Sequence, residues 1–433
     1  MNRFLKIRLL AGSVIAGMAL GAAPAMAGGF YLQDQSTKAS GRAFSGEVAD
    51  QGAESLWWNP AAIGGLTGGS AAISATAILP RADATNVNTL IIRPGGTPTP
   101  VGGDQTTGNP INNGVVPSGS IAHSVGHGLA VGLAITAPYN FTTQYPASSW
   151  SRYSALTTRL RTIDIQPSVA FELAPGFSLG AAVNVEHVSA SLGNALPNLS
   201  AALPDGTQQL NGKGWDVGYS LGAQYRHGPL SLGVSYKSAI THTLNGTLTV
   251  AGLLGPLAAN NMTVSTNAKF TTPWQLSVGG RYAVTRAVTL NGTVTRFGWA
   301  KFDAIRLGAP VNAALPENYR NTWSYAVGVD ADVAPTWTVR AGVQRDMTPV
   351  RGEQRDARVP DSNRWNFAVG GTHAFTPGFK IDAAFNYLKL DDAPINRTTA
   401  AYAGTAAQTP ILVNGMVTNP HVFIFSLGGR LSF

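Results

Sequence analysis

The sequence predicts an all-β protein, a 14-stranded antiparallel transmembrane β-barrel with an N-terminal, partly helical hatch that plugs its lumen. Three observations predict this fold. Alternating strands are joined by regularly placed tight turns, tryptophans begin several of the strands, and charged residues make up only 12% of the chain. After the first segment, no stretch reaches the roughly 18 apolar residues that a membrane helix requires. A chain with few charges and no helical span can still cross a membrane as a closed sheet.

The first 27 residues have the pattern of a Sec-type signal peptide. Arg3, Lys6 and Arg8 form a basic region, residues 9–20 are mainly apolar, and Ala-Met-Ala at 25–27 fits a cleavage site. We therefore expect a signal peptide at 1–27, a hatch at 28–67 and a barrel at 68–433. The expected location is the bacterial outer membrane.

Composition limits the possible chemistry. The predicted signal peptide holds three basic residues and no acidic one, so the formal net charge of +8 falls to +5 in the mature chain, which is too small to indicate nucleic-acid binding. The absence of Cys excludes disulfides and thiolate metal sites. The seven His residues are scattered and show no metalloprotease or nucleophile-elbow spacing. We expect no enzyme activity, no cofactor and no metal.

Tight turns set the strand count. Six short turns with Gly, Pro or polar residues join six hairpins, at 125–128, 174–176, 227–229, 284–286, 334–336 and 376–378. One strand near 70–79 and a final strand from His421 bring the expected number to 14. An even number of strands is typical of bacterial barrels.

Side chains alternate along these strands. From Trp323 to Val333, large apolar residues at odd positions face small or acidic ones at even positions. The final strand, ending at Phe433, has an apolar face and a small or polar face. Lipid on one side and a polar lumen on the other explain this pattern, although a soluble sandwich also alternates.

Aromatic residues favour the membrane barrel over the sandwich. Each of four tryptophans opens a strand that follows a long loop, so a closed barrel would place them at one level: Trp215, Trp274, Trp323 and Trp365. Phe177, Trp337 and Phe379 begin strands after tight turns and would form the opposite girdle. The alternative is a general preference of aromatics for strand ends.

The segment before the first strand does not alternate and is rich in Gly, Ala and Ser. About 40 residues are enough to fill the lumen of a 14-stranded barrel, and larger barrels are often plugged. A periplasmic tail is the alternative. The Trp57-Trp58 pair favours the plug, because both indoles would be exposed apolar surface on a free tail.

Several motifs resemble those of the FadL/OmpP1/TodX family of outer-membrane transporters for hydrophobic compounds. They are Gly28-Gly29-Phe30, the stretch 41–47, Asn59-Pro60-Ala61 in the hatch, 212–225, 272–274, 319–321, 348–350 and 359–365. This resemblance covers the whole mature chain. It implies passive uptake of long-chain fatty acids or similar molecules, captured by extracellular loops, bound inside the barrel and released sideways at a kink in the third strand.

We assign the expected kink to Ala137, Pro138 and Tyr139. Pro138 cannot donate a hydrogen bond to a neighbouring strand, so it belongs at an edge or a bulge. Alternatively, Pro138 merely ends the strand before a loop.

The expected ligand-binding residues lie in the hatch and the loops. Two apolar loops carry Leu196, Leu199, Leu253, Leu254 and Leu257, and could form a capture surface. The alternative is that these loops pack on each other without a ligand. Phe30 of the hatch is included with the ligand-binding residues.

The resemblance also implies a basic residue near a carboxylate head group, and Arg306 is the first choice. A second basic residue, expected after the fifth strand, is absent from 186–191. This departure leaves room for an uncharged aromatic hydrocarbon of the kind that TodX-like members carry. A general diffusion porin and an outer-membrane hydrolase are weaker alternatives.

The expected partners are a hydrophobic small molecule, outer-membrane lipid and lipopolysaccharide, with no nucleic acid, and the protein is expected to be a monomer. A charged loop between Arg345 and Arg364 has two interpretations. It contacts lipopolysaccharide phosphates or the hatch, or its charges neutralise one another on the surface, which is the interpretation we favour.

Overall fold

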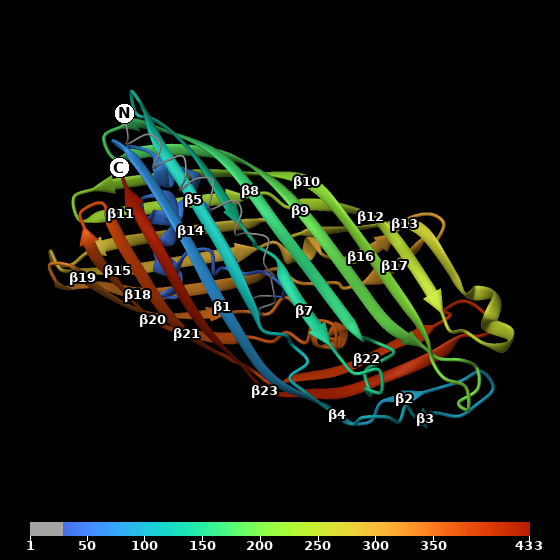
Figure 1. Ribbon diagram of the computed structural model, residues 1–433. Coiled ribbons are helices and arrows are strands. Elements are labelled where there is room, and N and C mark those ends of the chain that lie inside the picture. The colour runs from blue at the N-terminus through green and yellow to red at the C-terminus, as the bar shows by residue number, and fades with distance from the viewer. Residues whose placement is uncertain (1–28) are drawn as a thin grey trace.

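A computed structural model describes residues 29–433, so the predicted signal peptide at 1–27 lies outside the described residues. The chain forms one closed antiparallel barrel with 14 wall strands, as predicted (Figure 1). In chain order the wall is built by β1 (Gly69–Asn86), β5 (Gly114–Gly126), β6 (Leu129–Thr136) continued by β7 (Asn140–Gln144), β8 (Thr157–Ala174), β9 (Phe177–Leu196), β10 (Gly206–His227), β11 (Leu230–Lys237) continued by β12 (Ile240–Ala251), β13 (Met262–Thr272) continued by β14 (Gln275–Ala283), β15 (Val288–Phe297), β18 (Thr322–Ala334), β19 (Trp337–Asp346), β20 (Arg364–Thr376), β21 (Phe379–Leu390) continued by β22 (Ala393–Ala401), and β23 (Thr409–Ser432).

The barrel closes between its first and last strands. β1 pairs with β23 in antiparallel register from Ser70 opposite Ser432 to Asn86 opposite Gly415. All six predicted tight turns join neighbouring wall strands at the end of the barrel where the C-terminus lies (Figure 1). Short turns mark the periplasmic side of such barrels and longer loops the extracellular side.

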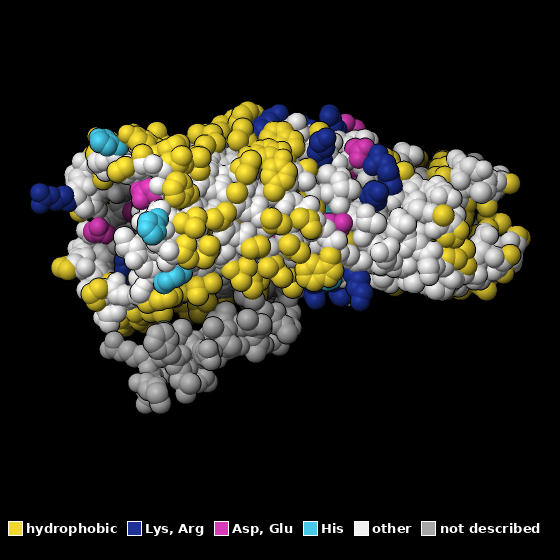
Figure 2. All heavy atoms as spheres, turned by 90° about the horizontal axis from the view of Figure 1, so that it is seen from above, with side chains coloured by type: hydrophobic (Ala, Val, Ile, Leu, Met, Phe, Trp, Pro, Cys, Tyr) yellow, Lys and Arg dark blue, Asp and Glu magenta, His cyan; other side chains and the backbone are white. Residues whose placement is uncertain are grey.

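The outer surface carries a belt of exposed apolar side chains around the half of the barrel near the tight turns (Figure 2). Trp215 is 58% exposed, and Trp323 and Trp365 also face outward. Phe177 and Trp337 are exposed at the periplasmic end. The alternation inferred from the sequence therefore separates an outer apolar face from the lumen.

Smaller elements decorate the extracellular end. Three short strands lie between β1 and β5, a hairpin follows β15, and three short 3-10 helices lie in loops. They are β2 (Leu90–Ile91), β3 (Thr99–Pro100), β4 (Thr106–Gly108), β16 (Ala304–Leu307), β17 (Ala313–Pro316), η4 (Gly255–Asn260), η5 (Trp299–Lys301) and η6 (Gly352–Gln354). Among residues 29–433, no helix is both long and apolar enough to cross a bilayer.

The described part of the hatch, residues 29–67, lies inside the barrel (Figure 1). It contains one short α-helix and three 3-10 helices, namely α2 (Thr37–Ser40), η1 (Glu47–Ala49), η2 (Ala53–Ser55) and η3 (Pro60–Ile63). The Ser36 hydroxyl caps α2 by accepting a hydrogen bond from Ala39 N. Most side chains of the hatch are buried, so it packs as part of the core.

The Asn59-Pro60-Ala61 motif joins the hatch to the wall. Asn59 caps η3 by accepting from Ala61 N at 2.9 Å, and its amide donates to Val48 O at 2.7 Å and Ala223 O at 3.2 Å. A Cβ atom on Gly222 would lie 1.8 Å from Asn59 Oδ1. Only glycine permits this approach.

A buried ion network holds the hatch at the periplasmic end of the lumen. Five basic and five acidic side chains take part, from the hatch and from five wall strands: Lys38, Arg42, Arg281, Arg340, Arg430, Glu47, Asp50, Glu54, Asp330 and Asp382. The Arg42 guanidinium contacts Asp50 at 2.6 Å and Asp330 at 2.9 Å, and also contacts Glu47. The numbers of basic and acidic groups are equal, and each of the ten side chains forms at least one ion pair. No ion of this network is therefore buried without a partner.

Candidate functional site: an apolar cavity beside a gap in the wall

An apolar cavity of about 750 Å³ lies in the extracellular part of the lumen. The wall strands β7, β8, β9, β10, β12 and β13 contribute to its lining, together with the hatch and the two connections β15–β18 and β19–β20. Its lining residues are Phe30, Phe141, Thr158, Arg159, Leu160, Ala190, Leu192, Leu210, Gly212, Leu244, Ala268, Phe270, Phe302, Ile305, Glu317, Tyr319, Arg358 and Val359. A mainly apolar lining with a few polar groups is typical of sites for small organic ligands.

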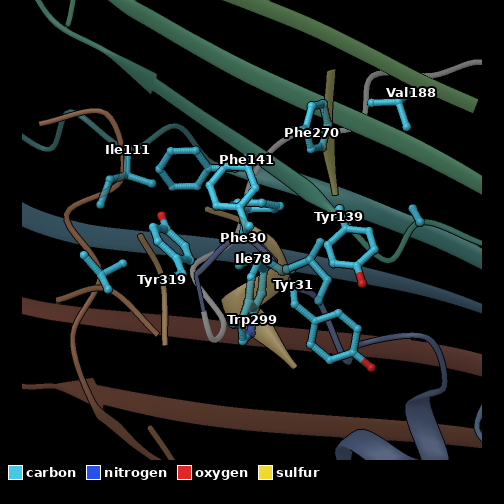
Figure 3. Packing of buried hydrophobic residues seen from close by; sticks show 14 of the residues in the cluster. Phe30, Tyr31, Ile78, Ile111, Tyr139, Phe141, Val188, Phe270, Trp299 and Tyr319 are labelled. Carbon is cyan, nitrogen blue, oxygen red and sulfur yellow. The ribbon is translucent and has the colours of Figure 1, made fainter. Parts of the chain in front are cut away.

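Aromatic rings form one side of the cavity around Phe30, which is 4% exposed. The Phe30 ring lies 4.9 Å from Trp299 and 5.1 Å from Phe302 in edge-to-face contacts. Figure 3 shows Phe30 of the hatch among side chains from distant segments, including Phe141 and Tyr319. The first residues of the hatch are therefore part of the cavity.

Arg358 brings a positive charge to the apolar cavity. Its Nη2 donates to Asn194 Oδ1 at 3.0 Å, whereas its buried Nη1 has no hydrogen-bond partner among the described residues. The nearby Asp356 carboxylate is bound to Arg397 at 2.8 Å. A carboxylate that reached Arg358 would supply the hydrogen-bond partner that Nη1 lacks, because an unsatisfied buried donor is costly.

Glu317 lies beside this guanidinium in the cavity wall. Burial raises the pKa of Glu317 to about 8; the charge of Asp356 adds to the shift, and Arg397 and Arg358 oppose it. Burial also lowers the pKa of Arg358, an effect opposed by Asp356 and Glu317. At neutral pH Glu317 is thus mostly protonated, which leaves Arg358 positively charged without a dedicated carboxylate partner.

Below this cavity the lumen becomes more polar. The next space, of about 520 Å³, has a mixed lining, in which Gln33, Lys237 and Gln344 lie beside Tyr31, Phe44 and Trp58. A further space of about 840 Å³ at the periplasmic end is bordered by members of the ion network, among them Arg281 and Arg430. An apolar molecule would find no continuous apolar route down the barrel axis.

The wall has a gap next to the cavity. β5 pairs with β6 from Gly119 opposite Ile135 toward the tight turn, but residues 114–118 pair only with β1. On the other side, residues 137–139 interrupt the third wall strand between β6 and β7. Thr136 pairs with Asp164 and Asn140 pairs with Arg161. Three residues therefore oppose two on β8, which is the geometry of a bulge.

Prolines border both sides of this wall gap, Pro117 on β5 and Pro138 on the interrupted strand. Neither residue has an N–H group to offer across the gap. The hatch fills the position that a paired strand would occupy. Leu32 N donates to Pro138 O at 2.7 Å, and Ser118 Oγ donates to Gln35 O at 2.8 Å. The gap is therefore covered from inside by the start of the hatch.

Arg306 requires a correction. Its side chain is 55% exposed and makes two hydrogen bonds with Asp303, at 2.9 and 2.6 Å. Its neighbour Ile305 lines the cavity instead. Successive residues of a strand point to opposite faces, so with Ile305 inward Arg306 faces solvent.

The five leucines of the apolar loops also lie away from the cavity. Leu196, Leu253 and Leu257 are buried with Val250, and Leu199 packs against them. Only Leu254 is largely exposed, at 40%. This loop cluster corresponds to the alternative in which the loops pack on each other. Of the predicted ligand-binding residues, Phe30 is the one that lines the cavity.

Arg358 was missed as a site residue because it lies in the charged loop interpreted as exposed. That loop folds over the lumen: Asp361 is fully buried, accepts a hydrogen bond from Gly29 N at 2.9 Å and contacts Arg364 at 3.4 Å. The density of charges between 345 and 364 was the available signal. Which of them point inward depends on the irregular path of the loop, which strand alternation does not predict.

Comparisons with known proteins agree with this architecture. A family model described as "Outer membrane protein transport protein (OMPP1/FadL/TodX)" matches residues 18–423. The 47 kDa outer membrane protein of Pasteurella multocida is 27% identical over 399 residues, covering 86% of this chain and 90% of that protein. The long-chain fatty acid transport protein of Escherichia coli is 25% identical over 411 residues, covering 86% and 89%.

The fold is also similar to solved structures. The crystal structure of a Pseudomonas aeruginosa FadL homologue superposes with a TM-score of 0.82 at 22% identity, covering 94% of this chain and 100% of that chain. Together with the family match across most of the sequence, these findings assign the protein. The chain belongs to the FadL/OmpP1/TodX family of outer-membrane transport proteins.

Proposed function

We propose that this protein carries out passive uptake of long-chain fatty acids, which bind in the apolar cavity with the carboxylate at Arg358 and leave through the wall gap. The observation that carries the proposal is the buried, unpartnered Nη1 of Arg358 at the wall of an otherwise apolar cavity. A guanidinium in this position suits a carboxylate at the end of an acyl chain. The relative from Escherichia coli is named as a long-chain fatty acid transport protein.

The path of release follows from the spaces around the cavity. The lumen below it is partly polar and ends at the charged side chains of the ion network, while the wall gap opens beside the hatch residues 30–35. A fatty acid that displaces the start of the hatch would reach the gap at membrane depth. Sideways release then keeps the acyl chain in apolar surroundings throughout.

The chemical identity of the ligand can be tested by titrating the purified protein with oleate, methyl oleate and toluene. The Arg358→Gln change should weaken oleate binding about 10- to 100-fold, as expected for loss of a charge-assisted hydrogen bond. Methyl oleate lacks the charge, so its binding should change little. Arg306→Gln is the matched comparison, because its guanidinium is outside the cavity, and should bind oleate normally.

Other outcomes would redirect the proposal. Equal oleate affinity in Arg358→Gln and the unaltered protein would remove the carboxylate site. Tight binding of toluene with none of oleate would favour the alternative substrate, an aromatic hydrocarbon, for which the cavity has a suitable apolar lining. Large hydrophilic conductance of the intact protein would instead indicate a general porin.

The proposal includes how the protein reaches its membrane. Residues 1–27 serve as a Sec-type signal peptide that is removed on export. One copy is sufficient for the proposed path, because the barrel closes through its own β1 and β23. Expression with and without residues 1–27, followed by fractionation of the outer membrane, tests the role of the signal.

A further inference from the structure

A row of basic side chains lies outside the barrel just beyond the apolar belt. On β8, Ile163 pairs with His187 of β9, which pairs with Trp215 of β10. Ile163 and Trp215 are exposed, so this level marks the extracellular edge of the apolar belt on these strands. The strands are continuous here, so outward-facing positions repeat every second residue.

One step further toward the extracellular end, the outward row is Arg161, Ser189 and Lys213. Arg161 pairs with Ser189, and Ser189 pairs with Lys213. Strands are about 4.8 Å apart, so the Cα atoms of Arg161 and Lys213 are separated by about 10 Å. A hydroxyl group thus lies between two cations, all on one outer surface.

The following row adds a third cation. Arg159 pairs with Ser191, which pairs with Asn211, so another hydroxyl lies beside the guanidinium; the Gln209 side chain donates to this hydroxyl at 2.7 Å. Arg159, which also borders the inner cavity, is exposed and lies two residues from Arg161 on the same face of β8, about 7 Å along the strand. Two like charges this close disfavour each other unless an anion lies between them.

No carboxylate neutralises this basic row, which we define as Arg159, Arg161 and Lys213. Among the described residues, none of the three makes an ion pair, and the buried Nε of Arg161 has no hydrogen-bond partner. The nearest acids on these strands, Asp164, Glu186 and Asp216, are at alternate positions that face the lumen. The outer surface here therefore carries uncompensated positive charge.

The height of the basic row identifies its partner. Figure 2 shows Lys and Arg side chains gathered where the apolar belt gives way to the mostly uncoloured extracellular part of the barrel. A lipid whose acyl chains lie against Ile163 and Trp215 would place its head group at this level. Both serine hydroxyls and three cations can then contact oxygen atoms of that head group.

We propose that the basic row binds the phosphate groups of a phosphorylated glycolipid of the lipid A type in the outer leaflet. Arg161 and Lys213 contact one phosphate across Ser189, and Arg159 contacts the same or a second phosphate. The lipid would lie next to the wall gap, because β7 pairs with the same part of β8. This binding site is on the outside of the wall, and it does not depend on what the inner cavity carries.

The test uses the full mature protein in detergent and measures lipid binding by native mass spectrometry. The probes are bis-phosphorylated lipid A and the same lipid with both phosphates removed. The unaltered protein should retain the phosphorylated form at least about tenfold better, in the range expected for charge-assisted contacts. The Arg161→Gln/Lys213→Gln double variant should lose this preference.

A charge-matched variant, Arg286→Gln/Lys301→Gln, removes two exposed basic residues elsewhere and should behave like the unaltered protein. Equal retention of the two lipids, or equal loss in both double variants, overturns the proposal. Displacement of the lipid by millimolar inorganic phosphate would also overturn it, by showing a site for free anions. If the double variant does not fold, Lys213→Gln alone, at an exposed position, decides the question by the same measurement.

Discussion

The side chain of Gln35 in the hatch hydrogen-bonds both the N–H and the C=O of Ala137 at the wall gap, as the backbone of a neighbouring strand would do. Its Oε1 accepts from Ala137 N at 3.0 Å, and its Nε2 donates to Ala137 O at 3.1 Å. Ser118, across the gap, donates to the backbone of the same glutamine. One side chain therefore satisfies the backbone that the bulge separates from its neighbouring strand.

Replacing this glutamine should loosen the start of the hatch. In Gln35→Ala the buried N–H of Ala137 loses its partner, which costs about 1–3 kcal/mol. Hydrogen exchange measured by mass spectrometry should show faster exchange, by about 10- to 100-fold, in peptides that contain residues 30–36 and 137–139. Gln51→Ala changes an exposed glutamine of the hatch and should leave these peptides protected. Unchanged exchange in Gln35→Ala would show that the gap is held by other contacts.

Deleting Pro138 should close the wall gap. Three residues, 137–139, oppose two residues on β8, so removal of one restores equal numbers and keeps Asn140 on its present face. The continued strand could then pair with residues 114–118 of β5. Fatty acid uptake by cells should fall to the level of a strain without the protein, if release is sideways.

A second proline provides the comparison for this deletion. Pro167→Ala alters a proline in the regular part of β8, where it pairs with Leu133, and should transport normally. Both variants should keep the heat-resistant mobility of a folded barrel on gels. Normal uptake with a folded Pro138 deletion would exclude the gap as the exit.

The fold could be predicted in detail because barrel strands repeat a simple pattern. Each tight turn contains residues that end a strand, and each strand shows its outer face through alternation, as in Trp323 to Val333. The same regularity places Trp215 at the lipid surface and allows the count of 14. The hatch was placed in the lumen by its length and small residues, while the positions of its helices depend on contacts such as Asn59 with Ala223.

The site was harder to predict because it depends on irregular segments. Phe30 and the 137–139 interruption were singled out from motifs and from a proline. Arg306 was chosen by its position relative to a family pattern, but a hairpin turns it outward toward Asp303. Arg358 lies inside only because the charged loop folds over the lumen and is held there by Asp361. Sequence periodicity contains no information about such a path.

The pH dependence of ligand binding should report on Glu317. This carboxyl has a pKa of about 8, so it is mostly neutral at pH 7 and mostly ionised at pH 9. An ionised Glu317 would pair with Arg358 and repel a ligand carboxylate. A carboxylate ligand therefore binds better when Glu317 is protonated. Affinity for decanoate should therefore decrease as pH rises through 8, by about tenfold between pH 7 and pH 9. Calorimetry can follow this change.

Substitution of the same residue separates this effect from general changes at high pH. Glu317→Gln stays neutral, so its decanoate affinity should be nearly constant from pH 7 to pH 9. Glu353→Gln changes an exposed glutamate in a neighbouring loop and should retain the dependence of the unaltered protein. A persistent decrease in Glu317→Gln would assign the titration to another group.

The ion network should be necessary for a closed lumen. Arg42 is fully buried and contacts three carboxylates, so Arg42→Met leaves buried negative charge without compensation, at a cost of about 3–5 kcal/mol. We expect a displaced hatch inside an intact barrel, observed as hydrophilic conductance in planar bilayers. Arg286→Met removes an exposed arginine at a periplasmic turn and should remain closed. A closed Arg42→Met channel would show that packing alone retains the hatch.

The cavity and the loop cluster make opposite predictions about where binding occurs. Ala190 lines the cavity, so Ala190→Trp should fill part of its volume and weaken oleate binding by at least about tenfold, because the added ring occupies space that the acyl chain needs. Leu253 is 1% exposed and packs in the loop cluster with Leu196 and Leu257. Leu253→Ala should therefore leave oleate affinity within about twofold, while it costs about 2–5 kcal/mol of packing energy. Titration of both variants with oleate distinguishes the two locations, since a capture site at the loops would reverse the order of the two losses.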